Sequence, residues 1–203
     1  MIVSNVPNLI LASQSPRRRE LLTLAGFQFT VRARPVEEVR APGEDPREYV
    51  MRLAQAKAEA SYREDPDEIV LGADTTVALG DRILEKPQHA AAAKAMLRAL
   101  SCREHIVLTG ICLRHPGGTI VDCESTRVSF VALEEREIEE YVASGEPMDK
   151  AGAYAIQGLA SKFVDRIEGC YFNVMGLPLA LLYKHLKDVV QAGSPPRVGN
   201  PTV

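Results

Sequence analysis

Apolar positions along the chain follow strand-like spacing in some segments and helix-like spacing in others. Residues 69–79 are apolar almost throughout, which is typical of a strand buried on both faces, whereas residues 27–32 alternate and predict a strand with one buried face. We expect further strands at residues 9–12, 82–84, 104–113, 119–131 and 163–167. Helical spacing predicts helices at residues 17–25, 46–63, 89–100, 133–144 and 177–191. Helices and strands alternate without a repeat, which favours an α/β layer architecture.

Several of these elements have recognisable ends. Ser15 and Asp45 stand at N-cap positions, and each precedes a proline at the first helical position, where the missing N–H costs nothing. Gly26 is placed to end the first helix. Residues 115–118, His-Pro-Gly-Gly, predict a turn that joins two long strands.

Composition narrows the class of protein. The chain has 203 residues, of which 46% are hydrophobic, which suits one compact domain. We expect residues 1–191 to form that domain and the Gly- and Pro-rich residues 192–203 to be a disordered tail. The net charge of −3 gives no basic surface for a nucleic-acid partner, and no apolar run reaches the ~20 residues of a membrane span. With no targeting signal in the sequence, we expect a cytoplasmic protein.

The cysteines and histidines do not have metal-site or disulfide spacing. The four cysteines include no CxxC pair, and the four histidines include no HxxxH or HExxH pair. We therefore expect free buried thiols and scattered surface imidazoles.

Three arginines, Arg17 to Arg19, stand in the first turn of the first predicted helix. A helix N-terminus carries about +0.5 of an elementary charge, so cations there are electrostatically misplaced unless an anion binds beside them. The alternative is a well-capped helix start with solvated arginines. The pattern favours a phosphate site, with at least one of the three side chains in solvent.

Asp74 lies in the middle of the most apolar predicted strand. A buried carboxylate is costly unless it is paired or binds a metal, although an Asp bonded to neighbouring backbone is an equally good interpretation of this segment alone. Gly72 and Ala73 keep the strand surface low, which we interpret as room for a substrate. Lys57 and Lys86, taken alone, are as readily solvated surface residues.

Residues 145–158 have too many glycines for a regular element and too few polar residues for a free linker. Ordered irregular backbone of this kind is where binding sites concentrate. Gln157 presents a donor and an acceptor, enough to bind the edge of a base, although a Gln that caps local backbone is as good an interpretation.

Together these segments resemble the Maf family of nucleoside triphosphate pyrophosphatases, in the family's order. The resemblance covers the chain from about Leu9 to Leu182 and rests on residues 11–18, 72–75, 85–87 and 145–158, Asn173, and residues 176–178. It implies a Maf/ITPase-like fold, in which an elongated mixed central sheet is flanked by helices around a central cleft. It also implies hydrolysis of nucleoside triphosphates to the monophosphate and pyrophosphate with a divalent cation, Mg²⁺ or Mn²⁺.

The resemblance also implies roles for individual residues. Asp74 matches the family's proton acceptor, and Glu38 matches a further cleft position; we expect Asp74, helped by Glu38, to hold the cation or orient a water. Arg17, Thr75 and Gln157 match the specificity determinants. Further cleft positions match Ser13, Arg18, Lys57, Lys86, Asp149 and Lys150.

The resemblance leaves several substrates and one different function open. The block from Glu146 to Gly152 resembles the branch that acts on dTTP and UTP, with CTP and modified pyrimidine nucleotides as further candidates; the 7-methyl-GTP branch departs from that block. A pyrophosphatase for inosine-type purines is another alternative, and a non-catalytic nucleotide-binding regulator of cell division is a third. Glu85 and Ala155 depart from the glycines common at these positions. A homodimer is an ordinary expectation.

Overall fold

Strand β3 (Ile69–Leu79) is central to a mixed seven-stranded sheet. The computed structural model describes residues 8–65 and 67–193. The strand order is β2-β1-β3-β5-β6-β7, and β4 pairs with β3. The other strands are β1 (Leu9–Leu11), β2 (Thr30–Val31), β4 (Arg82–Leu84), β5 (Glu104–His115), β6 (Gly118–Phe130) and β7 (Val164–Glu168). Strand β1 is parallel to β2 and β3, whereas the remaining pairs are antiparallel.

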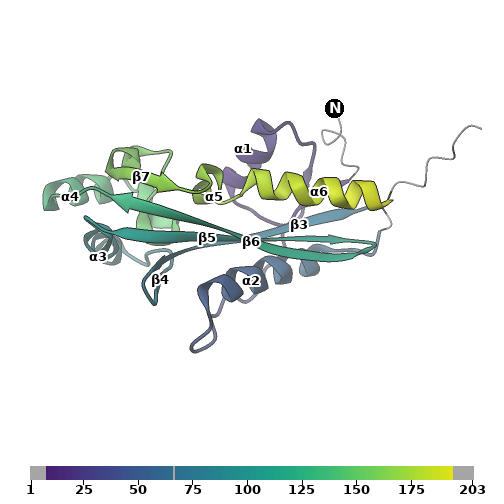
Figure 1. Cartoon of the computed structure of the whole chain (residues 1–203). Coiled ribbons are helices and arrows are strands. Elements are labelled where there is room, and N and C mark those ends of the chain that lie inside the picture. Colours follow the sequence, from purple (N-terminus) through teal and green to yellow (C-terminus); the bar gives the residue numbers. More distant parts are fainter. Residues whose placement is uncertain (1–7, 66, 194–203) are drawn as a thin grey trace, which may run out of the picture.

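The β5–β6 hairpin sets the length of the molecule. Its strands stay paired from Glu104↔Ser129 to His115↔Gly118, so the turn lies where the sequence predicts it. Because β3 runs beside most of this hairpin, the sheet is much longer than it is wide (Figure 1). The elongated mixed sheet of an α/β protein is thereby confirmed.

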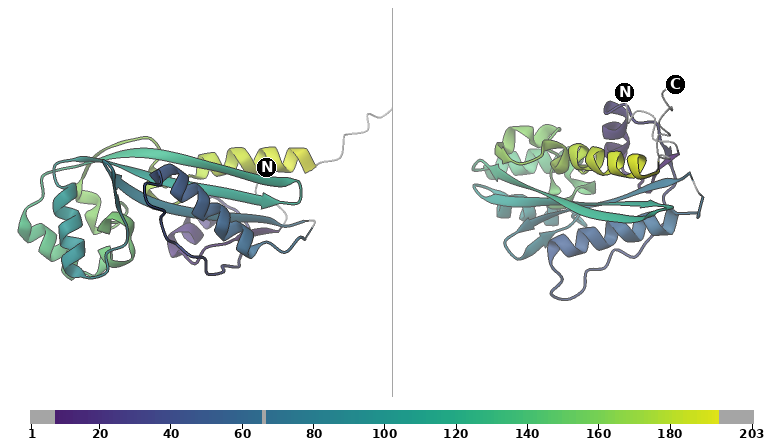
Figure 2. Two further views of the ribbon diagram at one scale, coloured as in Figure 1. Left: turned by 90° about the horizontal axis from the view of Figure 1, so that it is seen from below. Right: turned by 45° about the vertical axis from the view of Figure 1, so that its right-hand side comes forward.

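Helices cover both faces of the sheet (Figures 1 and 2). Helix α2 crosses one face, while α1 and α6 lie on the other, and α3 and α4 gather at one end of the sheet. The helices are α1 (Pro16–Leu24), α2 (Pro46–Ser61), α3 (Ala90–Leu100), α4 (Glu135–Ala143), α5 (Tyr171–Met175) and α6 (Leu179–Gly193). Short 3₁₀ turns at Glu146–Asp149 and Ala151–Ala153 make up much of the predicted irregular segment, and a third at Leu159–Phe163 follows it.

Alternation along β3 divides the core between the two faces. Leu71 and Ala73 belong to a cluster with α1 and α6, and Val77 belongs to another with α3 and α4. Val70 and Ala78 point the other way, into two smaller clusters under α2. A strand with both faces buried in this way explains the nearly continuous apolar run.

Some local predictions are wrong. The strand expected at residues 27–32 is reduced to Thr30–Val31, both exposed, because the three-residue strand β1 offers so little to pair with. Phe27 and Phe29 instead pack into the core ahead of it. Helix α5 was not expected, since five residues are too short to show a helical period.

The helix ends also divide into confirmed and corrected predictions. Asp45 caps α2 by accepting from the N–H groups of Arg47 and Glu48. Ser15 occupies the N-cap position of α1, but its side chain makes no capping hydrogen bond. Helix α6 runs to Gly193, two residues beyond the predicted end, and the rest of the predicted tail, residues 194–203, lies outside the described residues.

All four cysteines have free thiols, as expected, but only Cys112 and Cys123 are buried. The expectation of surface imidazoles is wrong for His105, which is 2% exposed and hydrogen-bonded to Tyr154. Within residues 8–65 and 67–193, no helix is long and apolar enough to cross a membrane.

Candidate active site

The candidate site lies at a gap along one edge of β3. On that edge β1 pairs with Leu9↔Ile69 to Leu11↔Leu71, and β4 pairs with Val77↔Leu84 to Leu79↔Arg82. Among the described strands, none pairs with residues 72–76 on this edge. Side chains from both faces of β3 therefore reach one opening.

A cleft of about 920 Å³ opens at this gap. Its lining includes every residue to which the resemblance assigns a role: Ser13, Arg17, Arg18, Glu38, Lys57, Asp74, Thr75, Lys86, Asp149, Lys150 and Gln157. Glu37, the residue before Glu38, lies outside the lining, so Glu38 is the one of these two neighbouring glutamates that reaches the cleft. The expected central cleft is thus present, and residues far apart in the sequence converge on it.

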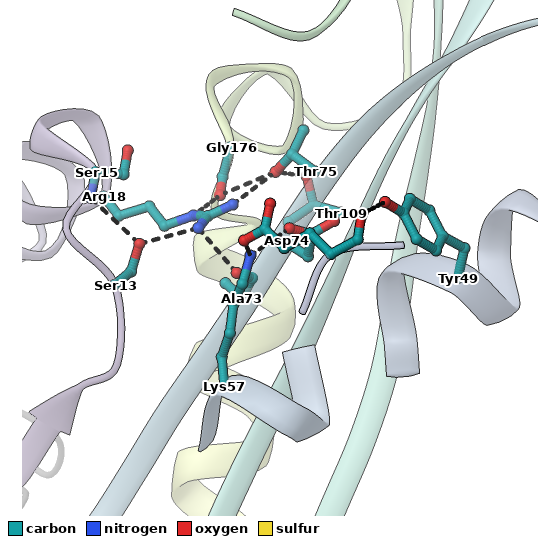
Figure 3. Close-up of polar contacts among 11 residues, drawn as sticks. Ser13, Ser15, Arg18, Tyr49, Lys57, Ala73, Asp74, Thr75, Thr109 and Gly176 are labelled. Carbon is teal, nitrogen blue, oxygen red and sulfur yellow. Dashed lines mark hydrogen bonds and ion pairs between the residues drawn. The ribbon is translucent and has the colours of Figure 1, made fainter. Parts of the chain in front are cut away.

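Asp74 and Glu38 share one lysine on the α2 side of the gap (Figure 3 shows Asp74 and Lys57). The Nζ atom of Lys57 lies 2.6 Å from Oδ1 of Asp74 and 2.7 Å from Oε1 of Glu38. Asp74 is only 8% exposed, so the lysine supplies the partner that a buried carboxylate requires. The loop that carries Glu38 is itself held by Tyr49, whose hydroxyl donates to the Glu38 carbonyl at 3.2 Å.

Two glycines let α2 come close enough for this contact. A Cβ at Gly72 would lie 2.0 Å from the carbonyl oxygen of Ala54, and one at Gly110 would lie 2.4 Å from that of Val50. Gly110 pairs with Asp74 across β3 and β5. The interpretation of Gly72 as room for substrate is therefore wrong, because its missing side chain accommodates the helix that carries Lys57.

Burial and charge act against each other on the two carboxyl groups. Burial raises the pKa of Asp74, and the nearby cations Lys57 and Arg18 oppose this rise without cancelling it. Burial also pushes up the pKa of Glu38, but the hydrogen bond and charge of Lys57 outweigh it, so that pKa falls below its usual range. A raised carboxyl pKa in a cleft is typical of groups that exchange protons.

The Arg18 side chain is bound by other groups of the protein. Its guanidinium makes four hydrogen bonds: Nε with the carbonyl of Gly176 (2.9 Å), one terminal nitrogen with Ser13 Oγ (3.0 Å) and the carbonyl of Ala73 (2.8 Å), and the other with Thr75 Oγ1 (3.0 Å) (Figure 3). A guanidinium has five N–H donors, so little of it is left for a phosphate. Arg18 therefore fills the gap and organises it.

The other two arginines of the cluster differ from Arg18. Arg17 is half-buried in the cleft, with a terminal nitrogen 3.9 Å from Oδ2 of Asp149. Arg19 is exposed and lies outside the cleft lining, as expected for at least one member. Of the predicted three-arginine phosphate site, only Arg17 retains a guanidinium available to an anion in the cleft.

The predicted irregular segment forms a polar rim opposite Asp74. Lys150 donates to the carbonyl of Glu146 at 2.7 Å and pairs with Asp149, while Gln157 is exposed at the cleft. The Glu146 carboxylate accepts from the Tyr141 hydroxyl at 2.9 Å and from the Leu159 N–H at 3.1 Å, which fixes the shape of the segment. Lys86, also exposed, adds a further cation to the lining.

Sequence reasoning missed two polar residues of the site. Tyr49 supports the Glu38 loop, and the buried Thr109 on β5 lies 3.0 Å from Thr75, oxygen to oxygen. The sequence signal at Thr109 was a hydroxyl within an apolar strand. Its role becomes apparent only when Thr75 is known to lie opposite on β3.

Asp74 and Glu38 are the residues that could hold a metal ion. Among the described residues no three His, Cys, Asp or Glu side chains form a ready-made site. However, Mg²⁺ is commonly held by one or two carboxylates together with substrate phosphates. The two carboxylates already converge on one cationic nitrogen, so the pair fits such an ion.

Comparison with known proteins gives matches over nearly the whole chain. A family model described as Maf-like protein matches residues 8–189, a range that contains the whole cleft. A protein named dTTP/UTP pyrophosphatase from Koribacter versatilis is 50% identical over 179 residues, covering 88% of this chain and 93% of the relative. Proteins of the same name from Anaeromyxobacter dehalogenans (51% over 178 residues, 86% and 90% covered) and a Geobacillus species (50% over 179 residues, 88% and 96% covered) are similarly close.

Proposed function

This chain belongs to the Maf family, and we propose that it is a nucleoside triphosphate pyrophosphatase that hydrolyses dTTP and UTP to the monophosphate and pyrophosphate. The observation that carries the proposal is the group formed by the buried Asp74, the half-buried Lys57 and the exposed Glu38 at the gap in β3, facing a rim of lysines and Arg17. The substrate range follows that of the relatives, about 50% identical, which are named for dTTP and UTP.

The charges of the cleft suit a triphosphate. Lys57, Lys86, Lys150 and Arg17 line it and can neutralise phosphate oxygens as negative charge develops on the leaving group. Gln157, exposed at the rim, offers an amide to the base edge. Because the cleft holds the triphosphate in one orientation, the attack by water becomes a reaction within the enzyme–substrate complex, which lowers its entropic cost.

Asp74 acts on the attacking water. Its carboxylate accepts a proton as the water oxygen bonds to the α-phosphorus, and the bond between that phosphorus and the bridging oxygen to the β-phosphate breaks, so pyrophosphate leaves with that oxygen. An Asp of ordinary pKa, near ~3.9, is a feeble base, and the raised pKa of Asp74 improves the match. Lys57 opposes the rise in the pKa of Asp74 and orients its carboxylate before the substrate binds.

A divalent cation, Mg²⁺ or Mn²⁺, is part of the proposal. Asp74 and Glu38 would hold it together with phosphate oxygens, and when bound it supplies charge neutralisation and a more acidic water. For the carboxylates to turn toward it, Lys57 must give up one or both of its contacts, and its flexible stem can carry the ammonium to a phosphate.

A substrate panel tests the proposal. The purified protein is incubated with dTTP, UTP, CTP, 7-methyl-GTP and ITP, with Mg²⁺, with Mn²⁺ or with chelator, and pyrophosphate release is followed over many turnovers. We expect dTTP and UTP to be the best substrates and chelator to abolish release. A preference for 7-methyl-GTP or ITP would contradict the substrate assignment. Tight nucleotide binding without turnover would instead support the non-catalytic regulator.

We also propose a cytoplasmic homodimer. Nucleoside triphosphates are cytoplasmic metabolites, and a twofold pair is the commonest closed assembly of like chains. Sedimentation of the purified protein tests the assembly, and a monomer at micromolar concentration would contradict it.

A further inference from the structure

Thr109 lies beneath the cleft without lining it. It is fully buried on β5, directly opposite Thr75 on β3. Its Oγ1 atom lies 3.0 Å from Thr75 Oγ1 and 3.0 Å from the carbonyl oxygen of Asn173 (Figure 3 shows Thr75 and Thr109). Thr75, in contrast, faces the cleft. Thr109 is therefore placed to act on a ligand only through Thr75.

The hydrogen bonds of these two hydroxyls have a fixed direction. Each hydroxyl carries one hydrogen. When Thr109 donates to the Asn173 carbonyl, Thr75 donates to Thr109. The reverse order, in which Thr109 donates to Thr75 and Thr75 donates to the carbonyl of Gly176, would replace the 3.0 Å bond to Asn173 with a longer contact of 3.4 Å, so the first order is favoured. In the favoured order the Thr75 hydrogen points to Thr109, Arg18 donates to the Thr75 oxygen at 3.0 Å, and one lone pair of that oxygen remains for a ligand.

Toward the cleft, Thr75 can consequently only accept a hydrogen bond. Ionised phosphate oxygens are acceptors, so they gain nothing from this oxygen. The nucleoside is the part of the substrate that carries donors. Uracil and thymine carry a donor at N3, where cytosine has a lone pair.

We propose that Thr109 is a positioning residue that keeps Thr75 an acceptor, so that the N3–H of uracil or thymine is favoured over the N3 lone pair of cytosine. This inference rests on the proposed function for its choice of nucleotide. It assigns to a residue outside the cleft a share in base selection that residues lining the cleft do not supply alone.

Thr109→Val tests the inference. Valine has the shape of threonine, and the Asn173 carbonyl keeps the N–H of Gly176 at 2.9 Å, so the variant leaves no carbonyl without a donor. The Thr75 hydroxyl is then free to turn its hydrogen toward cytosine N3. We expect the ratio of kcat/KM for UTP over CTP to fall about tenfold, the range of one hydrogen bond. Thr109→Ser should restore the wild-type ratio.

A double-mutant cycle separates positioning from general damage. In a Thr75→Val background, Thr109→Val should leave the ratio unchanged, because the hydroxyl through which it acts is gone. The matched control is Thr126→Val, a buried threonine on β6 whose hydroxyl donates to the Cys170 carbonyl at 3.1 Å and accepts from Asn173 Nδ2 at 2.9 Å. It binds the same α5 segment without touching Thr75, so it should lower stability and leave the ratio alone.

Two results would overturn the inference: an unchanged UTP/CTP ratio in Thr109→Val, or an equal change in Thr126→Val. Dissociation constants for UTP and CTP, measured with chelator by calorimetry, are expected to show the same ratio change. A wild-type protein that binds UTP and does not hydrolyse it would contradict the proposed function, and the binding ratios would still decide the role of Thr109.

Discussion

The side chains on the two faces of β3 reach the same gap but differ in their interactions. On the α2 face, a buried carboxylate is balanced by a lysine that also binds Glu38. On the other face, Thr75, Thr109 and Arg18 form a chain of hydrogen bonds that ends on main-chain carbonyls. In the first arrangement, the Lys57 ammonium can move from the carboxylates to a phosphate group when a polyanion binds. The second holds hydroxyl hydrogens in a fixed direction, which suits recognition better than chemistry.

The largest expected effect separates the chemistry from the binding. Asp74→Asn keeps the size of the side chain and leaves Lys57 paired with Glu38, so the variant should fold. It removes the proposed base, and we expect kcat for UTP to fall about 10²- to 10⁴-fold with little change in KM. Pyrophosphate release in single and multiple turnovers measures this. Activity within a factor of a few of wild type would remove Asp74 from the chemistry.

The next comparison sets Arg18 against its neighbour Arg17. Arg18→Met leaves four acceptors without their donor, and we expect the free energy of unfolding to fall by about 2–4 kcal/mol. Arg17→Met removes a distant, partly solvated ion pair and should cost less than about 0.5 kcal/mol, while weakening nucleotide binding. Urea denaturation of both variants decides the matter. Equal losses of stability would mean that Arg18 is not the organising residue.

A third prediction concerns the pKa of Asp74. Lys57 lowers this pKa and Glu38 raises it, against a larger upward effect of burial. Lys57→Met should therefore raise the pKa further, and Glu38→Gln should lower it. Carbon-13 NMR titration of the Asp74 carboxyl measures both. Shifts in the same direction would show that the two side chains do not act on Asp74 through their charges.

The same pKa has a consequence for stability. Because the folded-state pKa of Asp74 is above the unfolded one, the folded state holds the proton more strongly. This group's contribution is fully present below the unfolded pKa and is lost as pH rises through the folded pKa. Lys57→Met should lose more stability than wild type between acidic and neutral pH, as measured by urea denaturation at several pH values.

The smallest effect is expected at the rim. Gln157 is exposed, so Gln157→Ala should leave the free energy of unfolding within about 0.5 kcal/mol of wild type. We expect kcat/KM for UTP to fall about tenfold and that for CTP to change less. Equal losses for both nucleotides would make Gln157 a general contact and leave base selection to the Thr75 side.

Periodicity and end signals in the sequence predicted most of the fold. The continuous apolar run at residues 69–79 gave the central strand, and Asp45 followed by Pro46 marked the start of α2. The errors concern short elements: β2 depends on the length of its partner, and α5 is a single turn and a half. Such elements are determined by what lies beside them in space.

The residues of the site on the two faces of β3 also differ in how well the sequence predicts them. Asp74 stood out because charge in an apolar strand is conspicuous, and its need for a partner followed from physics. That Lys57 is this partner depends on the rotation of α2 over the sheet. Thr109 could not be identified, since a threonine is unremarkable in a strand until the residue opposite is known. Arg18 was assigned to the right place but to the wrong partners, because its direction depends on the carbonyls left free by the gap.

The contact between α2 and the sheet has a consequence for sequence variation. Alanine at Gly72 or Gly110 would add a methyl group where the helix backbone already lies, so the helix would have to move away and take Lys57 with it. In a scan of all single substitutions scored by activity, these two positions would rank with Asp74. Gly72 and Gly110 would then be intolerant to substitution because α2 packs directly against their backbone, although neither residue contributes a side chain to the site.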